Sequence, residues 1–173
     1  MKKNLNTLFA ILLCMAMAVT FTACEPNNET TGNENTEKSL IFRCGQDTIT
    51  AGSIYTSSKL DEAYAELDII RFAPGIDLVG DTDGKVKIIV ESLNETAIDV
   101  CTFGSCKRTT ATLDYTVTAF GDINAGTPLP LDIHYTPTPS DIYPAEALIT
   151  AYYEGEESNS ISFTLVMTNA KGE

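Results

Sequence analysis

The sequence predicts an antiparallel β-sandwich of roughly seven to nine short strands, and three observations support this prediction. Beyond residue 40, apolar and polar residues alternate along several short runs, which is typical of strands with one buried face. Clusters of Gly, Pro, Asn and Asp separate these runs at short intervals. No long helical pattern alternates with the strands, and this argues against a parallel α/β sheet.

The alternation is most regular in the C-terminal half of the chain. Apolar residues occupy every second position of 129–135 and 161–167, and 146–153 forms a further apolar run. A strand over 113–119 is predicted to bury Leu113, Tyr115, Val117 and Ala119. Turn-forming residues separate these strands at 121–122, 124–126, 137–141 and 155–159.

The pattern is less regular between residues 40 and 72. Two strand-like runs, 40–44 and 47–51, predict a hairpin at the edge of a sheet. Ser58 resembles the first residue of a capping box, and this predicts a short helix over 59–66. The alternative is that 66–72 extends a strand backwards through the same region.

A second hairpin is predicted between residues 76 and 90. The apolar runs 76–79 and 86–90 flank the sequence Gly-Asp-Thr-Asp-Gly at 80–84, whose residues suit a tight turn. The whole segment 40–84 either adds strands to the same sandwich or forms an appended hairpin region.

The N-terminus has the features of an export signal. Two lysines precede the uncharged apolar run 8–19, which is too short to cross a membrane as a helix. The sequence Phe-Thr-Ala-Cys at 21–24 then resembles the bacterial lipobox, in which small residues precede a cysteine that is acylated and becomes the first residue of the mature chain. Ordinary secretion, with cleavage after the Ala-Met-Ala sequence at 16–18, is the alternative.

The lipobox resemblance implies three segments. They are a signal peptide over 1–23 that is removed, a lipidated Cys24 with a linker over 24–39, and a β-sandwich domain over 40–173. The linker is polar and lacks apolar runs, so we expect it to be disordered. Because one acyl chain binds a membrane only marginally, stable attachment requires two or three chains on the cysteine. We therefore expect a domain anchored to the outer membrane, on its cell-surface or its periplasmic face.

Three motifs in the C-terminal half follow an order that resembles Bacteroidetes surface proteins with immunoglobulin-like modules. They are a Cys-x4-Cys loop at 101–106, an Ala-Gly turn within 123–126 and a Tyr-x-Pro strand end within 134–137. The resemblance covers residues 85–168. It implies an immunoglobulin-like β-sandwich that belongs to an exported lipoprotein.

Three cysteines remain once the signal is removed and Cys24 is lipidated. Cys101 and Cys106 enclose four residues, a separation that a loop at a strand end can bridge, so we expect a disulfide between them. Pairing of Cys44 with one of these two is the alternative. The three thiols and His134 match the ligand number of a zinc site, but export favours oxidation of the thiols, and we predict no metal there.

The charge of the chain restricts its partners. The sequence has 11 basic and 24 acidic side chains, and removal of residues 1–23 takes away two lysines and no acid, which leaves 9 − 24 = −15. Such an acidic surface repels phosphate backbones and anionic headgroups. We therefore exclude nucleic acid, and we expect attachment to the membrane through the lipid on Cys24 together with an unknown protein or glycan partner.

The acidic turn near residue 80 is a weak calcium candidate. Asp77, Asp81 and Asp83 offer oxygen ligands, but their spacing lacks the later ligand positions of an EF-hand loop. A plain turn explains these residues better. We therefore predict no metal and no cofactor.

Tyrosines are the candidate contacts for a sugar. Tyr143, Tyr152 and Tyr153 could stack on a glycan, although tyrosines also pack in the cores of sandwiches. No catalytic residue is predicted, because His134 is the single histidine and the sequence has no Gly-x-Ser-x-Gly elbow.

These observations lead to three hypotheses about function. The first is a lipid-anchored, non-enzymatic binding or scaffold module at the outer membrane. The second is a glycan-binding accessory lipoprotein of a surface polysaccharide-uptake system. The third is a carboxylate-dependent hydrolase, whose acidic pair the sequence does not locate.

Overall fold

The structure of the protein is a computed structural model that describes residues 38–111, 113–138 and 144–168. The predicted signal peptide, Cys24 and nearly all of the predicted linker lie outside these residues. Within them, no helix is both long enough and apolar enough to cross a membrane.

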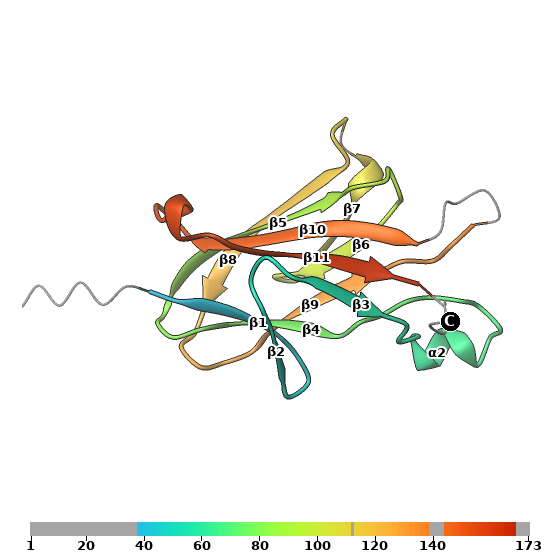
Figure 1. The fold of residues 1–173 in the computed structure, drawn as a ribbon, viewed down its shortest axis with the longest axis horizontal. Coiled ribbons are helices and arrows are strands. Elements are labelled where there is room, and N and C mark those ends of the chain that lie inside the picture. The colour runs from blue at the N-terminus through green and yellow to red at the C-terminus, as the bar shows by residue number, and fades with distance from the viewer. Residues whose placement is uncertain (1–37, 112, 139–143, 169–173) are drawn as a thin grey trace, which may run out of the picture. The chain divides into compact units, whose positions relative to one another are not determined.

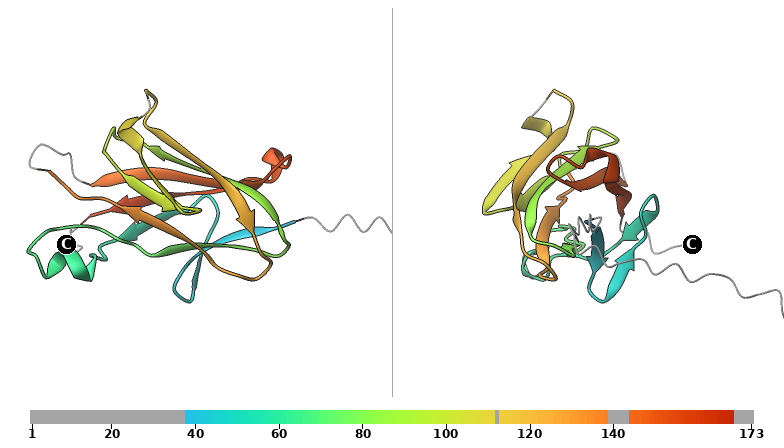
Figure 2. Two further views of the ribbon diagram at one scale, coloured as in Figure 1. Left: turned by 180° about the vertical axis from the view of Figure 1, so that it is seen from behind. Right: turned by 90° about the vertical axis from the view of Figure 1, so that its left-hand side faces the viewer.

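The described residues form eleven strands in two sheets that pack face to face (Figure 1; Figure 2). The six-stranded sheet contains, in spatial order, β2 (Asp47–Ile49), β1 (Leu40–Cys44), β4 (Ile76–Gly80), β9 (Leu129–His134), β6 (Asp99–Thr102) and β7 (Ser105–Arg108). The five-stranded sheet contains β3 (Ile54–Ser57), β11 (Ile161–Met167), β10 (Ala145–Tyr153), β5 (Gly84–Ser92) and β8 (Thr116–Ile123). The helical elements are α2 (Glu62–Ala65), η1 (Thr109–Ala111) and η2 (Glu157–Asn159).

The chain crosses between the two sheets repeatedly. It does so at every connection between consecutive strands from β2 to β6 and from β7 to β10. All neighbouring strands are antiparallel except β3, which runs parallel to β11. This is an all-β, immunoglobulin-like sandwich, as predicted.

Residues 40–84 belong to the same sandwich. They contribute β1, β2 and β4 to the six-stranded sheet and β3 to the five-stranded sheet. The predicted hairpin of β1 and β2 is present at the edge of its sheet, with Phe42 opposite Ile49.

The core lies between the sheets and is built from alternate residues of their strands. Five of the predicted inward positions of β9 and β11 are buried, namely Leu131, Ile133, Phe163, Leu165 and Met167, and the first position of each strand is partly buried against the same core. Aromatic rings join the two layers, because the Phe42 ring of β1 meets the Phe163 ring of β11 edge-on at a centroid distance of 4.8 Å. Alternation therefore identified the buried side chains of these strands correctly.

The hairpin predicted over 76–90 is wrong. β4 pairs with β1 and β9, whereas β5 pairs with β10 and β8, so the turn at 80–84 connects one sheet to the other. The two strands bury Ile76, Leu78, Val86 and Ile88 in the same core from opposite sides. A hairpin within one sheet would not place the strands on both sides of that core.

The strand predicted over 113–119 begins later than expected. Leu113 is fully exposed, and Tyr115 has a positive φ of 53°, which is incompatible with an extended strand. β8 therefore starts at Thr116 and runs through the predicted turn at 121–122. Gly121 is needed inside the strand because a Cβ there would collide with the Phe103 ring.

The predicted helix is shorter, and its cap is a different residue. α2 spans Glu62–Ala65, and Asp61 caps it by accepting a hydrogen bond from the Ala63 amide, so Ser58 is not the cap. Asp61 takes this role because Leu60, just before it, forms a β-bridge with Phe72. The alternative, a strand through 66–72, is not formed, and only Phe72 in this segment takes part in β-bridges.

Candidate functional site

The connection between β3 and β4 is the most irregular part of the sandwich. We call residues 58–75 the α2 loop, and it lies at the opposite end of the sandwich from the start of β1 (Figure 1). Phe72 holds the loop in place, because its backbone bridges to Leu60 on one side and to Tyr135 on the other. The rings of Phe72 and Tyr135 stack with centroids 5.9 Å apart, and both residues are fully buried.

The α2 loop exposes more aliphatic surface than any strand of the sandwich. Four of its large aliphatic side chains are exposed, namely Leu60, Leu67, Ile69 and Ile70. Leu67 is the most prominent, with 68% of its surface accessible. Single exposed aliphatic residues are ordinary, but four within eleven residues of one connection indicate an interaction surface.

Acidic side chains accompany these aliphatic residues. Glu62, Glu66 and Asp68 are all exposed in the same loop. The loop's arginine, Arg71, lies 3.7 Å from the Asp61 carboxylate and stacks over the Tyr64 ring at 4.3 Å. The exposed surface of the loop is therefore both apolar and negatively charged.

A shallow pocket of about 350 Å³ opens where the α2 loop meets β9. Its polar lining residues are Lys59, Asp61, Glu62, Asp132 and His134. Gly75 allows the Lys59 side chain to enter, because a Cβ on this glycine would stand 3.0 Å from the lysine Nζ. The pocket thus brings three carboxylates, one amine and one imidazole into a single depression.

The surroundings of His134 disfavour the protonated form of its imidazole. Burial lowers the pKa of its imidazole below the ordinary value, the charge of Arg71 lowers it further, and the carboxylates of Asp132, Asp61 and Asp99 oppose this shift. The His134 Nδ1 is buried and has no hydrogen-bond partner among the described residues.

The described lining of this pocket contains no serine, threonine or cysteine that could act as a nucleophile beside His134. Asp61 is already engaged, since one carboxylate oxygen caps α2 and the other faces Arg71. The remaining candidate groups are the Lys59 amine and the carboxylates of Glu62 and Asp132.

Two of the tyrosines predicted to contact a glycan, Tyr152 and Tyr153, are buried. Tyr152 and Tyr153 are only 8% and 3% exposed, which leaves little of either ring free to stack on a sugar. Tyr153 points into the core, and Lys87 lies over the outward-facing ring of Tyr152 at 5.7 Å. Tyr143 lies outside the described residues.

The three aspartates of the weak calcium candidate have structural partners instead. The Asp81 carboxylate accepts hydrogen bonds from the Ser39 amide and hydroxyl, which lower its pKa, and the Asp83 carboxylate accepts one from the Ala125 amide. Asp77 lies within β4, opposite Arg43. In the described part of the chain, no group of three or more His, Cys, Asp or Glu side chains could hold a metal ion.

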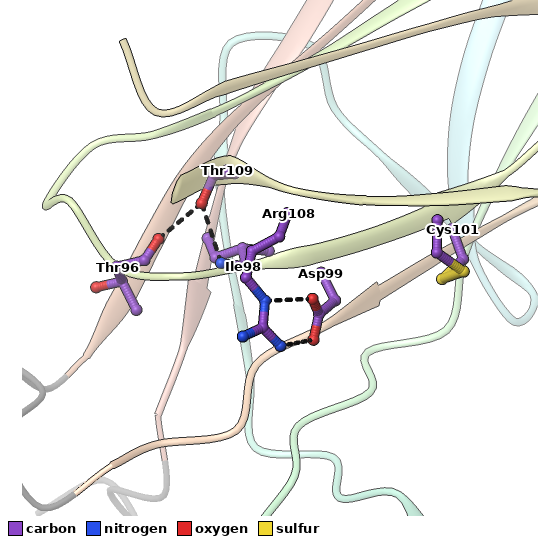
Figure 3. Close-up of polar contacts among 7 residues, drawn as sticks. Thr96, Ile98, Asp99, Cys101, Arg108 and Thr109 are labelled. Carbon is purple, nitrogen blue, oxygen red and sulfur yellow. Dashed lines mark hydrogen bonds and ion pairs between the residues drawn. A yellow bond between two sulfur atoms is a disulfide. The ribbon is translucent and has the colours of Figure 1, made fainter. Parts of the chain in front are cut away.

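Cys101 and Cys106 form the predicted disulfide (Figure 3). They are directly opposed in the hairpin of β6 and β7, whose two turn residues, Phe103 and Gly104, both have positive φ. The disulfide removes two of the thiols that a zinc site would need. Cys44 is free and half-buried, and its thiol donates a hydrogen bond to the Pro74 carbonyl at 3.4 Å.

Other polar contacts of this hairpin had no signal in the sequence. Arg108 binds the Asp99 carboxylate through two nitrogens, at 2.7 and 2.9 Å (Figure 3). The buried Thr109 hydroxyl accepts a hydrogen bond from the Ile98 amide and donates one to the Thr96 carbonyl. These contacts depend on strand pairing, which local sequence patterns do not reveal.

No family model matches the sequence, and no curated protein is detectably similar to it. Among solved structures, the N-terminal domain of PorA is similar with a TM-score of 0.48 and 9% identity, covering 76% of this chain and 99% of that chain. The ASH/PapD-like domain 7 of human CEP192 has a TM-score of 0.37 and 13% identity, covering 90% of this chain and 100% of that chain.

Proposed function

We propose that this protein is a lipid-anchored, non-enzymatic module that binds another protein at the outer membrane. The observation that carries this proposal is the set of exposed aliphatic side chains in the α2 loop. Exposed apolar groups at one end of a domain favour contact with an apolar surface. The nearby carboxylates disfavour an anionic lipid surface, so the partner is a protein.

The position of the α2 loop agrees with a tethered module. If Cys24 carries the lipid, the tether joins the sandwich at the start of β1, and the α2 loop lies at the other end (Figure 1). A partner can then approach the loop without displacing the anchor. We place the protein among exported lipoproteins of Bacteroidetes because of its lipobox and its ordered C-terminal motifs.

The other two hypotheses have weaker support. A glycan-binding surface requires exposed aromatic faces, and Tyr152 and Tyr153 are buried. A carboxylate-dependent hydrolase requires a pair of convergent carboxylates. Asp61, Glu62 and Asp132 line the pocket beside His134, but Asp61 is already engaged by the Ala63 amide and Arg71.

The anchor is tested by labelling cells with a fatty acid and comparing wild type with Cys24→Ala. We expect incorporation of label into the wild-type chain and none into the variant. Equal labelling of both chains would contradict the lipid anchor and would leave the protein-binding surface untouched.

The binding surface is tested with a photo-crosslinking amino acid placed at Leu67 in the full chain, in its native envelope. Leu113 is the matched control, because it is an equally apolar, fully exposed leucine in the turn before β8. We expect a discrete protein adduct from position 67, none from position 113, and loss of the adduct when Ile70→Asp is added. Identical adducts from both positions would contradict a specific site.

A further inference from the structure

The edge strand β8 has a row of main-chain groups that face away from its sheet. The Ser92 amide donates a hydrogen bond to the Tyr115 carbonyl, so these residues form a hydrogen-bonded antiparallel pair. Such pairs recur at every second residue, and Val117, Ala119 and Gly121 therefore also face β5. The intervening Thr118, Phe120 and Asp122 direct their N–H and C=O groups outward.

The outward groups of β8 are available for pairing. The N–H groups of Thr118, Phe120 and Asp122 have no hydrogen-bond partner in the described part of the chain. The Thr118 carbonyl accepts a hydrogen bond from the Lys107 Nζ at 2.8 Å, which confirms that it points away from β5. A side-chain amine can leave this position and be replaced by the N–H group of another strand.

Two lysine amines lie at this edge, although the chain as a whole is strongly acidic. Lys85 is opposite Asp122 in the β5–β8 ladder and its amine lies over the Phe120 ring, while Lys107 reaches Thr118 from β7. Lys87 is opposite Phe120, but its amine lies over the Tyr152 ring of β10. Neither edge amine lies within 4.0 Å of a carboxylate in the described residues. Half of the eight described basic residues lie on β5 and β7.

A groove of about 600 Å³ lies between β7 and β8, which are the edge strands of the two different sheets. Lys107, Val117 and Thr118 are among its lining residues. An extended segment paired with β8 would direct alternate side chains toward this groove and toward the outer face, where Phe120 is 46% exposed. Lys85 lies over the Phe120 ring at 5.7 Å on that outer face.

We propose that the free edge of β8 binds an extended acidic segment of a partner protein by strand addition. The segment exchanges main-chain hydrogen bonds with Thr118, Phe120 and Asp122, and its carboxylates meet the amines of Lys85 and Lys107. Main-chain pairing supplies affinity in this mode of recognition, and flanking side chains supply specificity. This site is separate from the α2 loop and does not depend on its function.

A second copy of the chain fits this edge less well. Pairing β8 with itself would bring four of these lysines together with only two copies of Asp122, and like charges at close range repel. Lysines on an edge strand also serve simply to prevent such self-pairing. The test must therefore separate recognition of an acidic segment from protection of the edge.

The probe is a synthetic peptide of 8 residues, the length of β8, in which Glu and Val alternate. It is added to the full chain in neutral detergent, and binding is measured by fluorescence anisotropy and by hydrogen exchange of β8. We expect slower exchange over Thr116–Ile123. An N-methylated form of the peptide, which keeps its carboxylates but donates no main-chain hydrogen bonds, should bind at least about tenfold more weakly.

Variants of the protein separate charge from backbone pairing. Lys85→Ala combined with Lys107→Ala should weaken binding about tenfold, whereas Lys59→Ala in the α2 loop is the matched control and should have no effect. Phe120→Pro removes an outward N–H without breaking the ladder to β5 and should abolish binding, while Phe120→Ala should reduce it only in part. Unchanged urea midpoints would show that the variants are folded.

Three results would overturn the proposal. Equal binding of the N-methylated peptide would mean that only charge attracts it. Equal binding of a peptide with alternating Lys and Val would mean that the edge has no charge preference. Self-association of the double lysine variant with unchanged peptide binding would mean that the lysines only prevent self-pairing.

Discussion

The Tyr153 hydroxyl donates a hydrogen bond to the Thr82 carbonyl at 2.8 Å. Thr82 lies in the turn that connects β4 of one sheet to β5 of the other. Gly80 and Gly84 flank this contact. A Cβ on Gly80 would meet the tyrosine oxygen, and one on Gly84 would stand 3.1 Å from the ring. The two glycines therefore allow the turn to pass closely over Tyr153.

Gly80→Ala should destabilise the fold by about 1–3 kcal/mol, because the added methyl group overpacks a site that Tyr153 already fills. Tyr153→Phe should cost about 1 kcal/mol through the lost hydrogen bond to Thr82. In the double variant the methyl group no longer meets an oxygen. The double variant should therefore be destabilised by less than the sum of the two single variants. Urea unfolding of all four proteins measures this coupling, and strict additivity would contradict the proposed contact.

This contact also explains a limit of the sequence-based prediction. Alternation identified buried residues such as Leu131 and Phe163, because the two faces of a strand are a local property. It did not show that β4 and β5 belong to different sheets, because strand partners are set by long-range packing. A Gly-Asp-Thr-Asp-Gly turn suits a hairpin and a connection between two sheets equally well. The contact that accompanies the connection here comes from Tyr153, which is distant in the sequence.

The candidate site was harder to predict than the fold. The aliphatic residues of the α2 loop resemble buried strand residues in sequence, and only the bridge between Leu60 and Phe72 shows that the intervening segment bulges outward. Conversely, tyrosines occur both on surfaces and in cores, so the sequence does not show that Tyr152 and Tyr153 are buried. The disulfide was predictable because its loop is short and local.

Removal of the disulfide should destabilise the sandwich without unfolding it. Cys101→Ser combined with Cys106→Ser should cost about 2 kcal/mol, because the crosslink restricts only a short loop of the unfolded chain. Alkylation of the native protein without reductant should modify only Cys44 among the described residues, and Cys44→Ser should abolish this labelling. Labelling of Cys101 or Cys106 in oxidised material would contradict the pairing.

The cap of α2 should control the order of the α2 loop. Asp61→Ala removes the acceptor for the Ala63 amide and the partner of Arg71, and should cost about 1 kcal/mol. Hydrogen exchange should accelerate within the loop, while β10 and β11 should remain protected. Asp61→Asn is the matched control, because its side-chain oxygen can still cap the helix. Faster exchange in β10 as well would show that the loop is coupled to the whole sandwich.

His134 should make the stability of the protein depend on pH. Because burial lowers its pKa in the folded state, the unfolded chain binds a proton more readily, starting near the ordinary value of 6.5. Its contribution to stability is therefore complete above that pH and is lost as the pH falls toward the folded pKa. We expect the difference in unfolding free energy between wild type and His134→Gln to shrink between pH 8 and pH 5, as measured with urea. Comparison with this variant cancels the titration of the acidic side chains. A difference that grows on acidification would mean that His134 is stabilised in its charged form by Asp132 and Asp61, and that the pocket favours cations.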